Sequence, residues 1–124
     1  MKYLCLVYLD KEHWSTVPDA ECATYGKGLR DSGHWVTGQA LQPTETATTV
    51  RIRNGQLAVT DGPFAETKEQ LAGFYLIEAR DLNEAITLAS KIPPARTGSI
   101  EVRPARELNV PPEMRAPETA RHTN

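Results

Sequence analysis

The chain has 124 residues, and its 14 lysines and arginines against 16 aspartates and glutamates give a formal net charge of −2. This length suits one domain with a single core. The charge leaves no basic surface of the kind that binds nucleic acid or anionic lipid. No apolar run approaches the roughly 20 residues that a membrane-spanning helix needs.

A strand and a helix are the first elements predicted. Residues 2–9 are nearly all apolar, which is typical of a central strand covered at least partly on both faces. This stretch is too short for a signal peptide and charged residues follow it, so we expect a cytoplasmic protein. Pro18 suits the first turn of a helix, which should end near Ser32-Gly33. The apolar stripe of that helix consists of Pro18, Cys22, Tyr25 and Leu29.

The middle of the chain predicts a second strand and then a hairpin. Residues 34–41 form the strand, in which Gly38 marks a bulge or a close approach between chain segments. Residues 46–53 alternate in the manner of a strand. Asn54-Gly55 is a strong hairpin signal because both residues accept a positive φ, and residues 56–60 supply the return strand. The hairpin should have one polar face, with Thr49, Arg51 and Arg53 on it.

The last third of the chain predicts a strand, a helix and a final strand. The first strand covers residues 71–79, and Asp81 with Glu84 three positions later then forms a capping-box-like helix start. The helix should bury Leu82, Ala85, Ile86 and Ala89 before Pro93-Pro94 ends it. The final strand covers residues 99–103, with Ile100 and Val102 turned inward. We expect a domain over residues 1–104 and a C-terminal tail over residues 105–124.

The order of elements predicts an α+β fold. A β-α-β unit, a hairpin and a second β-α-β unit match the ferredoxin-like split βαβ arrangement with an inserted hairpin. Two helices cover only one face of its four-stranded sheet. The other face would carry apolar side chains such as Leu4, Leu6, Tyr75 and Ile77, or their neighbours of opposite parity. An apolar face of that size normally marks an interface, so we expect a twofold homodimer with its sheets packed face to face.

The run DGPFAETKE, from Asp61 to Glu69, places many ionisable groups in the loop that follows the hairpin. Together with the surrounding sequence from Thr46 to Pro93, and with SIEVRP from Ser99 to Pro104, it resembles the YCII-related, or DGPF-domain, family. The resemblance covers roughly residues 1–104 and implies a dimeric α/β barrel. It also implies that genes for such proteins often neighbour those for extracytoplasmic-function sigma factors, which makes such a factor a possible partner.

The resemblance also bears on catalysis. Shorter YCII-type members pair a histidine on the first helix with an aspartate, whereas residues 18–32 contain no histidine, and Glu21 lies near that position. His34, at the start of the second strand, is the alternative proton shuttle, because an unperturbed imidazole titrates near neutral pH. A structural role for His34 stays open.

Asp61 is the candidate general acid or base, since a carboxylate beside an apolar ring such as Phe64 can be desolvated. The alternative is an Asx-type turn cap ahead of Gly62-Pro63. Phe64 could plug the core or form the wall of a substrate pocket.

Further candidates for substrate binding are charged. Lys68 could clamp an anion, Glu66 could be a second carboxylate, and Arg51 with Arg53 could hold an anionic substrate. The alternatives are a solvated turn of helix around Glu66, Lys68 and Glu69, and a solvated hairpin face.

The sequence contains no cofactor or metal motif. We expect no cofactor, no metal site, and two buried thiols in Cys5 and Cys22 rather than a disulfide. Two functions fit these features. One is a cofactor-free small-molecule enzyme with chemistry centred on Asp61. The other is a non-catalytic ligand-binding or regulatory partner, for instance of a sigma factor.

Overall fold

The computed structural model describes residues 1–115, which form six strands and two helices joined by short 3-10 turns. In chain order the elements are β1 (Lys2–Asp10), α1 (Asp19–Asp31), β2 (Trp35–Ala40), β3 (Thr48–Arg53), β4 (Gln56–Asp61), β5 (Glu69–Glu78), α2 (Leu82–Ser90) and β6 (Ser99–Pro104). The predicted elements are therefore all present, with ends that differ by a few residues at most.

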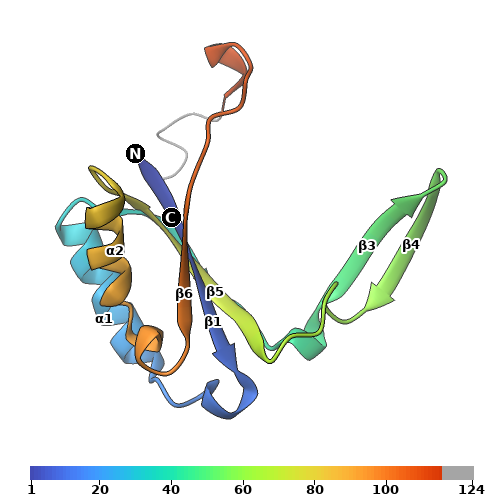
Figure 1. The fold of residues 1–124 in the computed structure, drawn as a ribbon, viewed down its shortest axis with the longest axis horizontal. Helices are drawn as coiled ribbons and strands as arrows, with labels where there is room; N and C mark the ends of the chain where they lie inside the picture. The colour runs from blue at the N-terminus through green and yellow to red at the C-terminus, as the bar shows by residue number, and fades with distance from the viewer. Residues whose placement is uncertain (116–124) are drawn as a thin grey trace.

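The strands form two separate antiparallel sheets. The main sheet has the order β2-β5-β1-β6, and β3 pairs only with β4. This order interleaves two β-α-β units as the split βαβ arrangement requires, which confirms the mixed α+β prediction. Both helices lie on one side of the main sheet, whereas the β3–β4 hairpin extends away from the body (Figure 1). One chain therefore closes no barrel by itself.

The core lies between the main sheet and the two helices. Alternate residues of β1 are buried because they face the helices: Tyr3, Cys5, Val7 and Leu9. Leu29 of α1 and Ala85 and Ala89 of α2 pack against them. The Tyr25 hydroxyl donates a 2.6 Å hydrogen bond to the Leu88 carbonyl and so ties α1 to α2. Cys5 and Cys22 are free thiols.

The prediction of the buried residues of α2 is correct for two of the four residues named. Ala85 and Ala89 are buried, but Leu82 and Ile86 are 49% and 51% exposed. Leu88 packs against the core instead. In a helix each residue is turned by about 100° from the one before, so Ile86 and Leu88 lie equally far on either side of the Ala85–Ala89 stripe, and contact with the rest of the core selects Leu88.

The uncovered face of the main sheet is apolar along its two central strands. The cross-strand pairs on this face are Leu4 with Leu76, Leu6 with Phe74 and Tyr8 with Leu71. We call these six residues the open face. The prediction placed Leu4 and Leu6 correctly, but Tyr75 and Ile77 lie on the helix side because β1 and β5 pair in the register that aligns Phe74 and Leu76 with them.

The hairpin forms as predicted but lacks support from the body. Asn54 and Gly55 both have positive φ, of 52° and 73°, as the tight turn requires. One face of the hairpin is apolar and is formed by Val50, Ile52, Leu57 and Val59. These side chains are 60–67% exposed. The predicted polar face, with Arg51 and Arg53, is the opposite one.

The C-terminal segment leaves the sheet after β6 and continues to a 3-10 turn at Pro112–Met114. There Arg115 and Glu107 form a 3.1 Å ion pair. Residues 116–124 of the predicted tail lie outside the described residues. No helix in the described part of the chain is long and apolar enough to span a membrane.

Candidate functional site

Residues 61–69 form a loop that is fixed at its start by the hairpin. Asp61 is the last residue of β4 and pairs with Thr48. The Gly62 N–H donates to the Ala47 carbonyl at 2.7 Å, and the Thr49 hydroxyl donates to the Gly62 carbonyl at 2.8 Å. Gly62 has a φ of +101°, a conformation that favours glycine. The Asp-Gly pair of the motif therefore sets the direction in which the chain leaves the hairpin.

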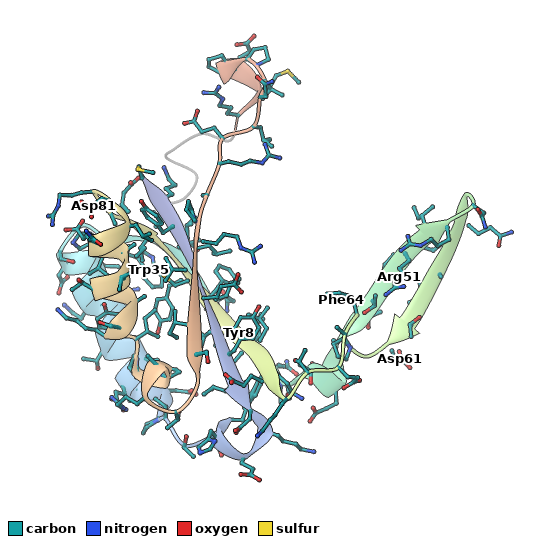
Figure 2. The ribbon with its side chains drawn as sticks, viewed as in Figure 1. Tyr8, Trp35, Arg51, Asp61, Phe64 and Asp81 are labelled. Carbon is teal, nitrogen blue, oxygen red and sulfur yellow. The ribbon has the colours of Figure 1, made fainter. Side chains whose placement is uncertain are left out.

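The Asp61 carboxylate is exposed and makes none of the hydrogen bonds or ion pairs found among residues 1–115. The Asx-type cap considered for it would require such a bond to a nearby N–H, and the Gly62 N–H is already bonded to Ala47. Asp61 therefore keeps a carboxylate that is available to a ligand. Figure 2 shows Asp61 on the hairpin near its base.

Phe64 is 79% exposed, so the interpretation of this ring as a core plug is wrong. Phe64 instead lines a hollow of about 760 Å³ at the base of the hairpin, which we call the hairpin hollow. Its other walls include Tyr8 and Leu71 of the open face and Val50 of the hairpin. Tyr8 and Phe64 both lie in the space between body and hairpin (Figure 2).

The charged residues of the loop have separate surroundings. Glu66 lines the hairpin hollow. Lys68 lies near the body, where its charge adds to the hydrogen bond from His13 in lowering the pKa of Asp10. Glu69 begins β5 and accepts a 2.8 Å hydrogen bond from the Ser99 hydroxyl. The interpretation of these residues as a turn of helix is therefore wrong, because Glu69 already belongs to the sheet and the residues before it form bends.

Arg51 is on the exposed polar face of β3, opposite Ala58 on β4. It points away from the apolar side of the hairpin that the hollow uses. Within one chain, Arg51 therefore does not line the hollow with Phe64 and Glu66.

His34 lies far from the loop, in the body of the protein. Its Nδ1 is 2.8 Å from the Glu78 carbonyl, and its own carbonyl accepts a hydrogen bond from the Glu78 N–H. Since a carbonyl only accepts, Nδ1 carries the proton. The neighbouring Trp35 is on the helix side of the sheet, well apart from Asp61 (Figure 2). One chain does not bring His34 and Asp61 together, and their catalytic roles stay a prediction.

Tyr8 is the wall residue that sequence reasoning missed. The alternation of buried and half-buried residues along β1 places it on the open face, directly opposite Leu71. In the sequence, Tyr8 is a phenol among aliphatic neighbours. Only the pairing of β1 with β5 shows that its side chain lies beside the loop. No group of three or more metal-ligating side chains occurs within residues 1–115.

Two comparisons place the chain among known proteins. The model of the YCII-related domain matches residues 1–109. The chain belongs to the YCII-related family. An uncharacterized protein of Rhizobium meliloti (strain 1021) is 54% identical over 66 residues. That match covers 52% of this chain and 53% of the relative, so the chain spans about half the length of the curated relative it matches.

In this YCII-related protein, a carboxylate on the first helix is engaged in an ion pair. The position near which a histidine was expected holds Glu21, and its carboxylate forms a 2.6 Å ion pair with Arg96. The hydrogen bond from Arg96 lowers the pKa of Glu21. Glu21 is therefore an ionised link between α1 and the turn before β6, which is a structural role rather than that of a proton shuttle.

Proposed function

We propose that this YCII-related protein is a twofold homodimer that binds a small molecule in the hairpin hollow and acts on it through Asp61, which precedes the lining residues Pro63 and Phe64 in the chain but does not itself line the hollow within one subunit. Phe64 and Tyr8 form the walls of this site, and Glu66 is its second carboxylate. Asp61 exchanges a proton with the bound molecule as a general acid or base. Neither Lys68 nor Arg51 lines the hollow within one chain, so each attracts an anionic group of the ligand only if the second subunit brings the two together.

A free-standing hairpin with one apolar face is the observation that most directly supports a dimer. An isolated two-stranded hairpin is marginally stable in water at best. Here β3 and β4 pair only with each other and expose Val50, Ile52, Leu57 and Val59. Such a hairpin needs a surface to cover its apolar side, and exposed apolar patches of this kind mark interaction sites.

A second copy of the chain offers a matching surface. The open face is apolar at its centre, and no helix within residues 1–115 covers it. In a twofold pair, the open faces pack against one another and each hairpin covers apolar surface of the other subunit. This arrangement is the dimeric α/β barrel expected for the family. It would also close the hairpin hollow against water, which strengthens the electrostatic effect of Asp61 on a ligand.

Dimerisation would also decide what His34 can do. Because His34 and Asp61 are separate within one chain, His34 assists Asp61 only if another subunit brings its copy to the hollow. If dimerisation does not, Asp61 works with Glu66 and Lys68 of its own loop.

The dimer is tested by a matched pair of hairpin substitutions. Val59→Glu places a charge on the apolar face, whereas Ala58→Glu places the same charge on the adjacent polar face, opposite Arg51. We expect the wild type and Ala58→Glu to sediment as dimers at micromolar concentration, and Val59→Glu to sediment as a monomer. A monomeric wild type, or equal behaviour of the two variants, would contradict the proposed dimer.

The catalytic role is tested with Asp61→Asn. A library of small organic acids and amines is screened by NMR, and ligands of the hollow should shift the amide signals of residues 64–67. For a ligand that the wild type converts, we expect Asp61→Asn to keep the dimer and binding but to lose about 10²- to 10⁴-fold in rate. Asp31→Asn, which removes an exposed carboxylate on α1, should retain the wild-type rate.

The two arms of this experiment separate the alternatives. Conversion by Asp61→Asn at the wild-type rate would remove Asp61 from the chemistry. Ligand binding without any conversion would favour the second candidate, a non-catalytic ligand-binding or regulatory protein. The exposed apolar hairpin face also suits a protein partner such as an extracytoplasmic-function sigma factor. If the protein is such a partner, we expect a monomer that co-purifies with the sigma factor. The Val59→Glu substitution should then abolish the association.

A further inference from the structure

A second cavity, of about 510 Å³, lies on the opposite side of the sheet, between α1 and strands β2 and β5. We call it the helix cavity. It is separate from the hairpin hollow, and among residues 1–115 only Leu41 lines both. Its volume falls in the range of roughly 300 to 1,000 Å³ that small-molecule sites occupy.

Small residues on α1 create the space. Cys22, Ala23 and Gly26 all line the cavity, with Gly26 buried and Ala23 at its exposed edge. Large side chains at these positions would have filled it. Gly26 has an added role, because a Cβ there would lie 3.4 Å from the Trp35 ring. Gly26 therefore lets α1 pack closely on the Trp35 ring, and the small side chains of Cys22 and Ala23 leave the space beside it open.

Aromatic rings form the inner wall. Trp35 meets Tyr75 edge to face, with ring centroids 6.0 Å apart and planes at 87°. The Trp35 ring also lies over Gly38, where a Cβ would come within 2.7 Å of it. Trp14 lines the cavity as well, so both tryptophans of the chain border it. Such a wall suits a flat ring system, because aromatic groups pack edge to face or offset against one another.

Two polar groups of the inner wall, Cys22 and Tyr75, are uncharged at neutral pH. Burial raises the pKa of the Cys22 thiol. Burial, followed by the neighbouring Cys22 thiol, raises the pKa of the Tyr75 phenol. Both groups therefore keep their protons, and the interior favours an uncharged, mostly apolar molecule.

A cation lies at the rim. The Arg30 guanidinium is 5.0 Å from the centroid of the Trp35 ring and lines the cavity. Among residues 1–115 no carboxylate lies within ion-pair distance of it. Asp19 lines the cavity too, but it is eleven residues away on the same helix, which corresponds to about 16 Å along the axis. Arg30 is thus free to bind an anionic group that a molecule in the cavity presents to solvent.

We propose that the helix cavity is a binding site for a flat aromatic molecule that carries one acidic group. The ring lies against Trp35 and Tyr75 beneath α1, and the acidic group binds Arg30 at the rim. This site does not depend on the hairpin hollow or on the dimer.

The test uses 2-naphthoate as the probe and 2-naphthamide as its uncharged control. Calorimetry on the full-length wild type should show that naphthoate binds about tenfold more tightly than the amide. Arg30→Gln should remove most of that difference, whereas Lys27→Gln, which changes a cation on α1 outside the cavity lining, should preserve it. Equal affinity of acid and amide for the wild type would overturn the role of Arg30.

The location is tested with a matched pair on α1. Ala23 lines the cavity and Ala20 does not. We expect Ala23→Trp to weaken naphthoate binding at least tenfold by filling the space, and Ala20→Trp to leave it unchanged. Circular dichroism confirms that both variants are folded.

A measurement on the wild type keeps the location falsifiable if Ala23→Trp does not fold. In a ¹H–¹⁵N NMR titration, naphthoate should shift the indole N–H signals of Trp14 and Trp35 and the amide of Gly26. Shifts confined to the hairpin and the open face, or no binding of naphthoate at 1 mM, would overturn the proposal.

Discussion

Gly38 and Gly28 both occupy regular elements, but their surroundings differ. A Cβ on Gly38 would lie 2.7 Å from the Trp35 ring and 3.0 Å from the Phe74 carbonyl oxygen. A Cβ on Gly28 would meet nothing within 4 Å. Gly38 therefore allows the close approach between chain segments that the sequence predicted. Gly28 lowers the helix propensity of α1, and no neighbouring atom requires a glycine there.

These two glycines yield a paired prediction. Gly38→Ala should destabilise the protein by about 1 to 3 kcal/mol, because the Trp35 ring must shift in a packed environment. Gly28→Ala should stabilise it by up to about 1 kcal/mol through helix propensity. Urea unfolding of both variants and the wild type checks the two signs, and a stable Gly38→Ala would show that Trp35 is loosely held.

Asp61 and Phe64 show what the sequence alone could tell about single residues. The chemistry of the motif was visible in the sequence, so the loop was found as a candidate site. The exposure of Phe64 was not visible, since a lone phenylalanine between strands is usually buried. The partner of each residue depends on how far the hairpin extends from the body, which local patterns do not encode.

At the level of elements, periodicity and end signals predicted most of the structure. Asp81 caps α2 as expected, since its carboxylate accepts from the Glu84 N–H at 2.9 Å. Glu84 in turn accepts from the Arg80 N–H rather than from Asp81 itself. Burial was harder to predict than element type. In α2 the apolar residues cover more than one face, and only contact with β1 and β6 selects the face that is buried.

The Glu21–Arg96 ion pair, which links α1 to the turn before β6, predicts a pH dependence. The pKa of Glu21 is lowered in the folded protein, chiefly by the hydrogen bond from Arg96. Its stabilising effect is therefore fully present above the unfolded carboxyl pKa of about 4.3 and is lost as the pH falls through the folded value.

Thermal unfolding of the wild type and Glu21→Gln should accordingly differ at pH 7, with the wild type more stable, and the difference should shrink toward pH 3. Glu45→Gln removes an exposed carboxylate with no ion pair among residues 1–115 and should show no such convergence. A Glu21→Gln difference that persists at pH 3 would mean that packing, not charge, is responsible.

At the scale of the whole molecule, the two sides of the sheet have different proposed tasks. The helix side encloses the core and the helix cavity, while the other side exposes the open face and faces the hairpin hollow. A substitution on the hairpin should therefore affect assembly without affecting naphthoate binding. The Val59→Glu and Ala23→Trp variants are expected to have separable effects for this reason.

The sequence by itself determined the order of the elements, the split βαβ arrangement, the turn at Asn54-Gly55 and the family. These features follow from local periodicity, turn chemistry and a long motif. Only the tertiary structure decided the open-face set, the exposure of Phe64, the separation of His34 from Asp61 and the helix cavity. Strand register and the placement of α1 on the sheet depend on packing between distant segments, and a register shift of one residue reverses the face on which every side chain of a strand lies.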